Sequence, residues 1–286
     1  MRLSFVKLHG AGNDFVLVDE FGAEIVSDEK KPSFIRKISA RRFGVGGDGV
    51  IFVQSSDKAH ARFVFYNPDG SRAEMCGNGI RCFGKYVYES GIAKNNPLRV
   101  ETDVGVIMLK LDEVGGEVKG ARVDMGKPVL EREKIPAVGE AGTRFVDEEI
   151  ILGDETVRVT AVGMGNPHAV LFVEDVELID VLGLGSKIRN KIDVFPKGVN
   201  VHFIQSVGVN EFKIRSYERG VEDETLACGT GICACAMGVV LNNKADDKKK
   251  IIFHARGGIL SVELIDGRLY LNGPAAEVFR GSLSYG

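Results

Sequence analysis

The chain repeats itself, and this repeat constrains the fold more than any other feature. The pattern Cys-Gly-x-Gly-Ile occurs at residues 76–80 and again at 228–232, a shift of 152 positions. Three further pairs keep the same order with shifts of 151 to 153 positions: 10–15 with 163–168, 49–54 with 200–205, and 104–107 with 257–260. Because four ordered pairs with a nearly constant shift are hard to obtain by chance, the sequence predicts two homologous lobes.

The repeat also predicts how the chain is divided. We expect an N-terminal lobe at residues 1–120 and a C-terminal lobe at 121–273. The tail at 274–286 has no counterpart in the repeat, and we expect it to return to the N-terminal lobe as an extra strand. A charged stretch at 131–155 is unmatched as well. A length of 286 residues is sufficient for two hydrophobic cores.

Within each lobe, most of the sequence is typical of short strands separated by turns. Helical periodicity is clearest directly after two cysteines. Ile80, Phe83 and Val87 recur at helical spacing, and Gly91 follows where a helix C-cap is expected. The matching run at residues 232–241 is apolar on all sides, which predicts a buried helix.

Each Cys-Gly-x-Gly segment is therefore expected at the start of a buried helix. Backbone N–H groups at such a position attract a carboxylate, and they lower the pKa of a neighbouring thiol from its usual value of ~8.5. A single cysteine before a helix is more often a small packing residue. Two cysteines in matched contexts favour the functional interpretation, with Cys76 and Cys228 as reactive thiols. Cys82, Cys233 and Cys235 fall inside the helices, where we expect them to pack in the core.

Composition excludes several classes of function. The net charge of −3 and the pI near 6.0 do not indicate the excess positive charge that binds nucleic acid or an anionic membrane. No run approaches the ~20 apolar residues that cross a bilayer, and polar residues interrupt any signal-peptide core at the N-terminus. The five cysteines form no disulfide framework of a secreted domain, so we expect reduced thiols and a cytoplasmic location.

Two weaker motifs do not support a cofactor. Residues 44–49 match the glycine pattern of dinucleotide-binding proteins, but the strand-like segment follows the glycines instead of preceding them, which predicts a turn. Cys233 and Cys235 lack the paired ligand clusters of a zinc site. No lysine is singled out as a partner for pyridoxal phosphate. We therefore expect no cofactor and no metal.

Several segments together resemble the diaminopimelate epimerase family. They span most of the chain, and the two cysteine segments are the most specific. The matching segments are 9–15, 65–71, 75–82, 165–168, 198–201, 217–220 and 225–231. The resemblance implies an α+β fold of two pseudo-symmetric lobes. Each lobe would be a mixed, β-barrel-like sheet wrapped around a central helix, with the active site in the cleft between the lobes.

The resemblance also implies a reaction, which is the cofactor-independent epimerisation of LL-diaminopimelate to meso-diaminopimelate in lysine and cell-wall precursor biosynthesis. Cys76 and Cys228 would face the substrate's α-carbon from opposite sides as acid and base, assisted by His168 and Glu218. A homodimer is implied too. The positions that match the family's substrate contacts are Asn13, Asn67, Gly77, Asn78, Asn166, Asn200, Glu218, Arg219, Gly229 and Thr230.

One position departs from the family pattern. Some members carry Gln where this chain has Gly49, so a side-chain contact in the cleft is lost, and we expect a water or neighbouring backbone to replace it. Thr230 stands where a Ser occurs elsewhere and keeps the hydroxyl.

Two alternative functions remain at this stage. A proline or hydroxyproline racemase would use the same pair of thiols on a similar fold, although the Tyr-Glu-Arg-Gly segment at 217–220 and the set of asparagines argue against it. A thiol redox protein would need a resolving cysteine near a reactive one, often as Cys-x-x-Cys, and neither Cys76 nor Cys228 has such a neighbour.

Overall fold

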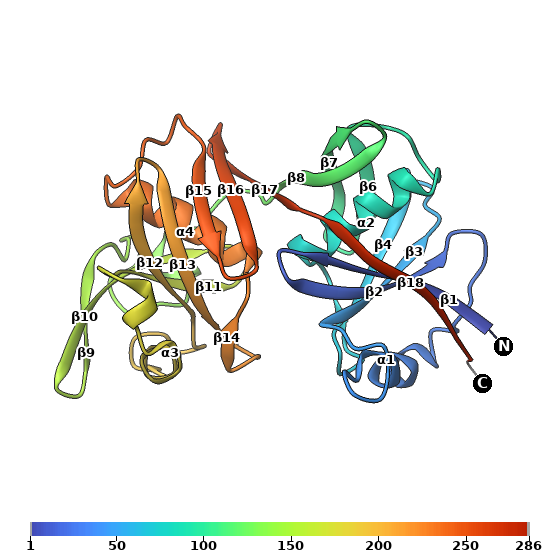
Figure 1. Ribbon diagram of the computed structural model, residues 1–286. Coiled ribbons are helices and arrows are strands. Elements are labelled where there is room, and N and C mark those ends of the chain that lie inside the picture. Colours follow the sequence, from blue (N-terminus) through green and yellow to red (C-terminus); the bar gives the residue numbers. More distant parts are fainter. Residues whose placement is uncertain (1, 285–286) are drawn as a thin grey trace. The chain divides into compact units, whose positions relative to one another are not determined.

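The computed structural model describes residues 2–284 as a mixed α+β protein (Figure 1). Its internal contacts divide the chain into two compact units. The N-terminal unit contains the chain up to Asp124 together with the C-terminal segment from Asn272, and the C-terminal unit is Met125–Leu271. Each unit has its own sheet and helices.

The N-terminal unit contains ten strands and two helices within the described residues. In chain order they are β1 Arg2–Gly10, β2 Asn13–Glu20, α1 Lys31–Ser39, β3 Gly49–Gln54, β4 Ala61–Tyr66, β5 Arg72–Ala73, α2 Gly77–Glu89, β6 Leu98–Thr102, β7 Gly105–Val114, β8 Glu117–Asp124, the end of β17 and β18 Ala276–Ser284. β18 pairs antiparallel with β1, so the C-terminal tail completes this unit.

The C-terminal unit follows the same plan with a longer entry segment. Its elements are η1 Arg132–Lys134, β9 Glu148–Leu152, β10 Glu155–Gly163, β11 Pro167–Phe172, η2 Val176–Leu178, α3 Val181–Arg189, β12 Asn200–Gly208, β13 Glu211–Glu218, β14 Asp223–Thr225, α4 Gly229–Leu241, β15 Ile251–Ala255, β16 Gly258–Ile265 and β17 Arg268–Pro274. The last residues of β17 lead back into the N-terminal unit.

The repeat in the sequence is a repeat of topology. Strands β2 and β3 pair in parallel, as β11 and β12 do. β4 is antiparallel to β3 and parallel to β6, and β13 has the same two relations with β12 and β15. The prediction of two related lobes with mixed sheets is therefore confirmed.

One helix in each unit is enclosed by the sheet. α2 packs against β1, β2, β3, β4, β7 and β8, and α4 packs against β10, β11, β12 and β16 (Figure 1). The nine residues from Gly231 to Val239 are all buried, as the unbroken apolar pattern predicts. Because helices cover both faces of β3, five of its six residues are buried.

Two outer helices were not foreseen from the sequence. α1 packs Phe34, Ile35 and Ile38 against the outer face of the N-terminal sheet, and α3 packs Val181 and Ile188 against the equivalent face in the other unit. Each helix has only nine residues, which gives the 3.6-residue period too few turns to stand out. α3 also contains two glycines, which are unfavourable in a helix, and one of them, Gly185, is required by its close approach to Tyr217.

Candidate active site

Cys76 and Cys228 occupy equivalent positions at the starts of α2 and α4. Each is the N-cap residue of its helix, and each side chain accepts a hydrogen bond from a backbone N–H in the first turn. The donor–sulfur distances are 3.4 Å from Gly79 to Cys76 and 3.3 Å from Gly231 to Cys228. The predicted place of both thiols at helix starts is therefore confirmed. Gly77 and Gly229 are the first helical residues, where backbone N–H groups lack helical partners.

Two predicted asparagines gather around Cys76. The carbonyl oxygen of Asn13 lies 3.9 Å from the Cys76 sulfur and accepts a hydrogen bond of 3.3 Å from Asn78. The Asn13 amide in turn donates to Asp48 at 2.7 Å, which fixes its orientation. Cys76 is partly exposed, so a small molecule has access to this group of side chains.

Asp48 belongs to a charged network that sequence reasoning missed. Arg41 contacts both Asp14 and Asp48, and Lys7 pairs with Asp14 at 2.5 Å. Burial opposes ionisation of Asp14, but hydrogen bonds from Arg41 and Lys7 outweigh it and lower the pKa of Asp14 to about 2. The network holds the turn at residues 44–48 beside Asn13. The prediction of a turn at residues 44–49 is confirmed up to residue 48, where the segment leads into β3.

The space beside Gly49 is filled in part by backbone, because the carbonyl oxygen of Tyr66 lies 2.7 Å from the place of a Cβ atom. The expected substitute contact to a substrate stays a prediction. A Cβ atom at Gly49 would overlap the ring of Phe65 on the adjacent strand β4. Phe65 also makes an edge-to-face contact with Phe15. An aromatic side chain therefore takes the position that a larger residue would need. Asn67 lies nearby in the chain, and its amide donates to Ser71 within its own turn.

Cys228 lies in a more enclosed environment than Cys76. Its sulfur is 3.6 Å from the hydroxyl of Thr230 and lies near the carboxylate of Glu218. Burial raises the pKa of Cys228 well above its ordinary value, and the negative charge of Glu218 adds to the rise. The donors Thr230 and Gly231 oppose the rise without cancelling it. The prediction that a helix start lowers the thiol pKa is therefore wrong for Cys228.

Glu218 is held at the end of β13 by a hydrogen bond from the hydroxyl of Thr225. Asn200 ties the neighbouring chain segments together, because its amide donates to the carbonyl of Pro167 at 3.0 Å and its oxygen accepts from the N–H of Arg219 at 2.9 Å. The guanidinium of Arg219 donates to the carbonyl of Lys197. Asn200 and Arg219 therefore shape the strand ends around Cys228.

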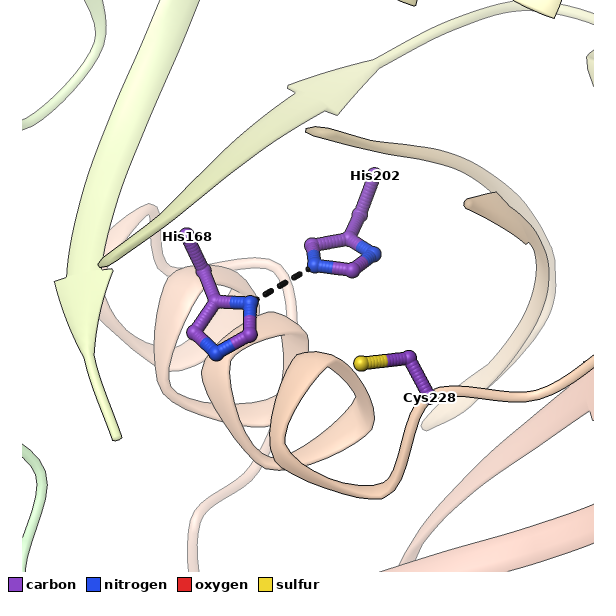
Figure 2. Close-up of side chains that lie close together, drawn as sticks. All are labelled: His168, His202 and Cys228. Atoms are coloured by element: carbon purple, nitrogen blue, oxygen red, sulfur yellow. Dashed lines mark hydrogen bonds between the residues drawn. The ribbon is translucent and has the colours of Figure 1, made fainter. Parts of the chain in front are cut away.

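His168 starts a buried chain of hydrogen bonds. Its Nε2 lies 2.7 Å from Oδ1 of Asn166, and its Nδ1 lies 2.8 Å from Nε2 of His202. Nδ1 of His202 is 2.8 Å from the hydroxyl of Ser216. Burial lowers the pKa of both imidazoles, that of His202 to about 3, so both rings are neutral at pH 7. Figure 2 shows the two rings close to the sulfur of Cys228.

His202 is the second residue that sequence reasoning missed. It lies on the same face of β12 as Asn200, because side chains two positions apart in a strand point to one side. In the parallel register of β11 and β12, His168 is opposite Asn200. The donor atoms of His168, His202 and Cys228 lie within 4.8 Å of one another, which makes this group able to hold a metal ion.

The remaining cysteines lie in the core, as predicted. Cys82, Cys233 and Cys235 have no exposed surface. Burial raises the pKa of Cys82 to about 12 and raises that of Cys235 well above the usual range. Full burial keeps these three thiols away from solvent and from small molecules.

The fold is shared with a class of two-lobed proteins that includes racemases and epimerases. A hydroxyproline epimerase from Agrobacterium vitis matches with a TM-score of 0.70 at 15% identity over 99% of this chain and 92% of that one. A phenazine biosynthesis protein of the PhzF family from Bacillus anthracis also gives 0.70 at 15% identity, over 100% of both chains. At such identities the likeness concerns the fold alone.

The sequence identifies the family within that class. The diaminopimelate epimerase family model matches residues 5–131 and 160–278. Diaminopimelate epimerases from Moorella thermoacetica and Archaeoglobus fulgidus are 47% and 44% identical over 281 and 283 residues, covering 98% and 99% of this chain and 98% and 97% of theirs. The chain belongs to the diaminopimelate epimerase family.

Proposed function

We propose that the protein interconverts LL- and meso-diaminopimelate without a cofactor, as an isomerase with Cys76 and Cys228 as acid and base. The observation that carries the proposal is the duplicated arrangement of a cysteine N-cap, two glycines and a buried helix. Relatives with 40–47% identity carry the name diaminopimelate epimerase, which supports this substrate over other amino acids.

The reaction needs a base on one face of the α-carbon and an acid on the other. One thiolate removes the α-proton, and the opposite thiol returns a proton from the other side, so the two sulfurs exchange protonation states in each turnover. The pair titrates as a coupled unit. Backbone N–H groups at the helix starts would bind the substrate carboxylate and stabilise charge that develops during proton removal.

The environments of the two thiols suggest their resting roles. Burial and the nearby Glu218 carboxylate raise the pKa of Cys228, so this sulfur keeps its proton in the resting enzyme. Cys228 is then the acid, and Cys76 enters the reaction as the base. In the reverse direction the roles exchange.

The polar residues around each thiol suggest how the substrate is bound. Asn13 and Asn78 lie beside Cys76, while Glu218 and Thr230 lie beside Cys228. We propose that these groups orient the ammonium and carboxylate groups at the reacting centre. Glu218 and His168 assist the thiols. The second amino-acid group of the substrate is bound by Arg219 and by the remaining asparagines, which are Asn67, Asn166 and Asn200.

Assembly and location are part of the same proposal. No helix in residues 2–284 is long and apolar enough to cross a membrane. The five cysteines are all free thiols, which is consistent with a reducing compartment. We propose a cytoplasmic homodimer that acts on a small-molecule substrate.

Solvent deuterium exchange tests the proposal directly. The enzyme is incubated in D₂O with LL-diaminopimelate, and in a parallel reaction with L-proline, after dialysis against EDTA. We expect deuterium at one α-carbon of the meso product and none in proline. Exchange into proline alone would favour a proline racemase, and a loss of activity after the dialysis would contradict a metal-free mechanism.

A further inference from the structure

The cluster formed by His168, His202 and Cys228 combines three donors that transition metals prefer. The residues come from β11, β12 and the N-cap of α4, and all three are buried. Their donor atoms lie within 4.8 Å of one another, and Figure 2 shows the sulfur directed toward the two imidazole rings. Three such donors with one open position are typical of zinc sites that also bind a water or a small molecule.

The hydrogen bonds fix the tautomers of the two histidines. Asn166 presents a carbonyl oxygen to Nε2 of His168, so this nitrogen carries the proton and Nδ1 is left with a lone pair. The bond of 2.8 Å between the rings is then donated by Nε2 of His202. Nδ1 of His202 accepts from the Ser216 hydroxyl. A single proton therefore occupies the space between the two rings.

A cation can take the place of that proton if the hydrogen bond between His202 and Ser216 reverses its direction. If His202 moves its proton to Nδ1, that nitrogen donates to the hydroxyl of Ser216 and Nε2 becomes a free donor atom. His168 already donates from Nε2 to Asn166. Each ring would thus give one N–H to an oxygen and one lone pair to the metal. This is the arrangement that orients histidine ligands in metal sites.

We propose that Nδ1 of His168, Nε2 of His202 and Sγ of Cys228 bind a divalent cation of borderline softness, represented by Zn²⁺. Tetrahedral zinc with ordinary bond lengths places its donors about 3.3–3.6 Å apart. The two nitrogens, 2.8 Å apart, must separate by about 0.5 Å, and the sulfur, which lies up to 4.8 Å from them, must move closer by as much as about 1.2 Å. Imidazole and thiolate donors favour Zn²⁺, Co²⁺ or Cu²⁺ over Mg²⁺ and Ca²⁺, which prefer oxygen.

The proton balance of binding is simple. Both imidazoles are neutral before and after binding, and the cation displaces one proton from the thiol of Cys228 to solvent. The thiolate neutralises one of the two positive charges, and the carboxylate of Glu218 beside the sulfur offsets the second. Binding therefore leaves no large uncompensated charge in this buried region.

The consequence for catalysis rests on the proposed function. A metal-bound Cys228 has no proton to give, and its sulfur, which donates electron density to the cation, is too weak a base to take one. The cation is therefore a reversible inhibitor of the epimerase, and not a cofactor. His202 acts here as a metal ligand only, because no step of the proposed reaction uses it.

Cobalt binding tests the site independently of catalysis. Co²⁺ is added to EDTA-treated protein kept reduced with a phosphine. We expect one ion per chain and a thiolate-to-cobalt charge-transfer band in the near ultraviolet. His202→Gln and Cys228→Ser should each abolish the band, and Ser216→Ala should weaken binding by roughly 10- to 100-fold. His254→Gln is the matched control, because His254 on β15 contacts the partly exposed Glu211 on β13 and should leave the band unchanged.

The outcomes separate the site from the function. Absence of the charge-transfer band in the wild type, or its persistence in both His202→Gln and Cys228→Ser, would overturn the site. A thermal melting curve checks that His202→Gln is folded. If His202→Gln does not fold, Cys228→Ser alone provides the test. In the activity assay, we expect micromolar free Zn²⁺ to halve the rate of the wild type. His202→Gln should need a free Zn²⁺ concentration at least about tenfold higher for the same inhibition. EDTA should restore the activity of the wild type. If the chain lacks epimerase activity but shows the band, the site stands and the proposed function fails.

Discussion

At the scale of single residues, the two cysteines differ more than their matched sequences suggest. Cys76 is partly exposed beside two amides, whereas Cys228 is buried beside a carboxylate. Such asymmetry suits a pair in which one sulfur starts with its proton and the other without. The proposed mechanism nevertheless needs both, because each turnover removes a proton from one face of the α-carbon and adds a different proton from the other face.

We therefore expect Cys76→Ala and Cys228→Ala each to lose at least roughly 10²- to 10⁴-fold in epimerisation rate, which is the usual contribution of a positioned acid or base. The control is Cys82→Ala, which removes a fully buried thiol from the same helix as Cys76 and should retain most of the activity. Rates are measured by product chirality, and thermal melts confirm folding. Near-normal turnover in either active-site variant would eliminate the two-thiol mechanism.

The network behind Asn13 gives a pH-dependent contribution to stability. The pKa of Asp14 is about 2 in the folded protein against an ordinary value of 3.8. A lowered folded-state pKa stabilises the protein above the unfolded value, and this contribution is lost as the pH falls through the folded value. The shift corresponds to about 2 kcal/mol at neutral pH.

Asp14→Asn should therefore lower the free energy of unfolding by about 2 kcal/mol at pH 7, and the difference from wild type should shrink from pH 4 toward pH 2. Urea titrations at several pH values measure it. Asp154→Asn changes an exposed turn carboxylate between β9 and β10 and serves as the control, with little expected effect. A destabilisation by Asp14→Asn that is constant with pH would show that the ion pairs are not its cause.

Residue roles were predictable where the repeat supplied a second copy. The matched contexts singled out Cys76 and Cys228 without any knowledge of the fold. Asp48 and His202 were missed because each is significant only through a partner, Asn13 and His168, that lies about 34 positions away. The raised pKa of Cys228 was missed for a related reason, since burial and the proximity of Glu218 are properties of the packed structure.

At the scale of elements, the two helix starts offer a matched experiment. Gly79 and Gly231 are the third residues of α2 and α4 and donate to their respective cysteine sulfurs. A Cβ atom at Gly79 would meet its nearest neighbour at 3.4 Å, an ordinary contact. A Cβ atom at Gly231 would overlap the imidazole of His202. The same substitution therefore has opposite consequences in the two units.

We expect Gly79→Ala to be neutral or to stabilise the protein by up to ~1 kcal/mol, because alanine favours the helix. Gly231→Ala should destabilise it by about 1–3 kcal/mol, because the buried ring of His202 must move. Equilibrium unfolding in urea measures both. Equal effects of the two substitutions would mean that the His202 ring is not packed against α4 as described.

Helix prediction succeeded and failed for physical reasons that are visible in these elements. α2 and α4 have 13 residues each, with a clear apolar stripe or an entirely apolar surface. α1 and α3 are shorter and depend on tertiary packing, since Gly185 in α3 is needed where the helix approaches Tyr217. These two helices are stabilised by packing on the sheet that they cover, and this packing cannot be predicted from the local sequence.

At the scale of the whole molecule, the proposed mechanism requires thiols from two compact units to serve one α-carbon. Each unit contributes one sulfur from an equivalent helix start. Two sulfurs that can reach opposite faces of the same carbon can also reach each other when no substrate separates them. Mild oxidation should then join Cys76 to Cys228, while the three buried thiols stay reduced.

We expect diamide to abolish activity with the loss of two free thiols per chain, and a reductant to restore it. Peptide mapping under non-reducing conditions should recover one cross-linked pair that contains residues 76 and 228. Saturating diaminopimelate should slow the reaction, because bound substrate keeps the sulfurs apart. Cys76→Ala is the control. It lacks one of the two cysteines, so diamide should form no disulfide within its chain and should not remove two free thiols from it. If oxidation inactivates the enzyme while both thiols remain free, or couples either of them to Cys82, Cys233 or Cys235, the two sulfurs do not share a substrate in the way the reaction requires.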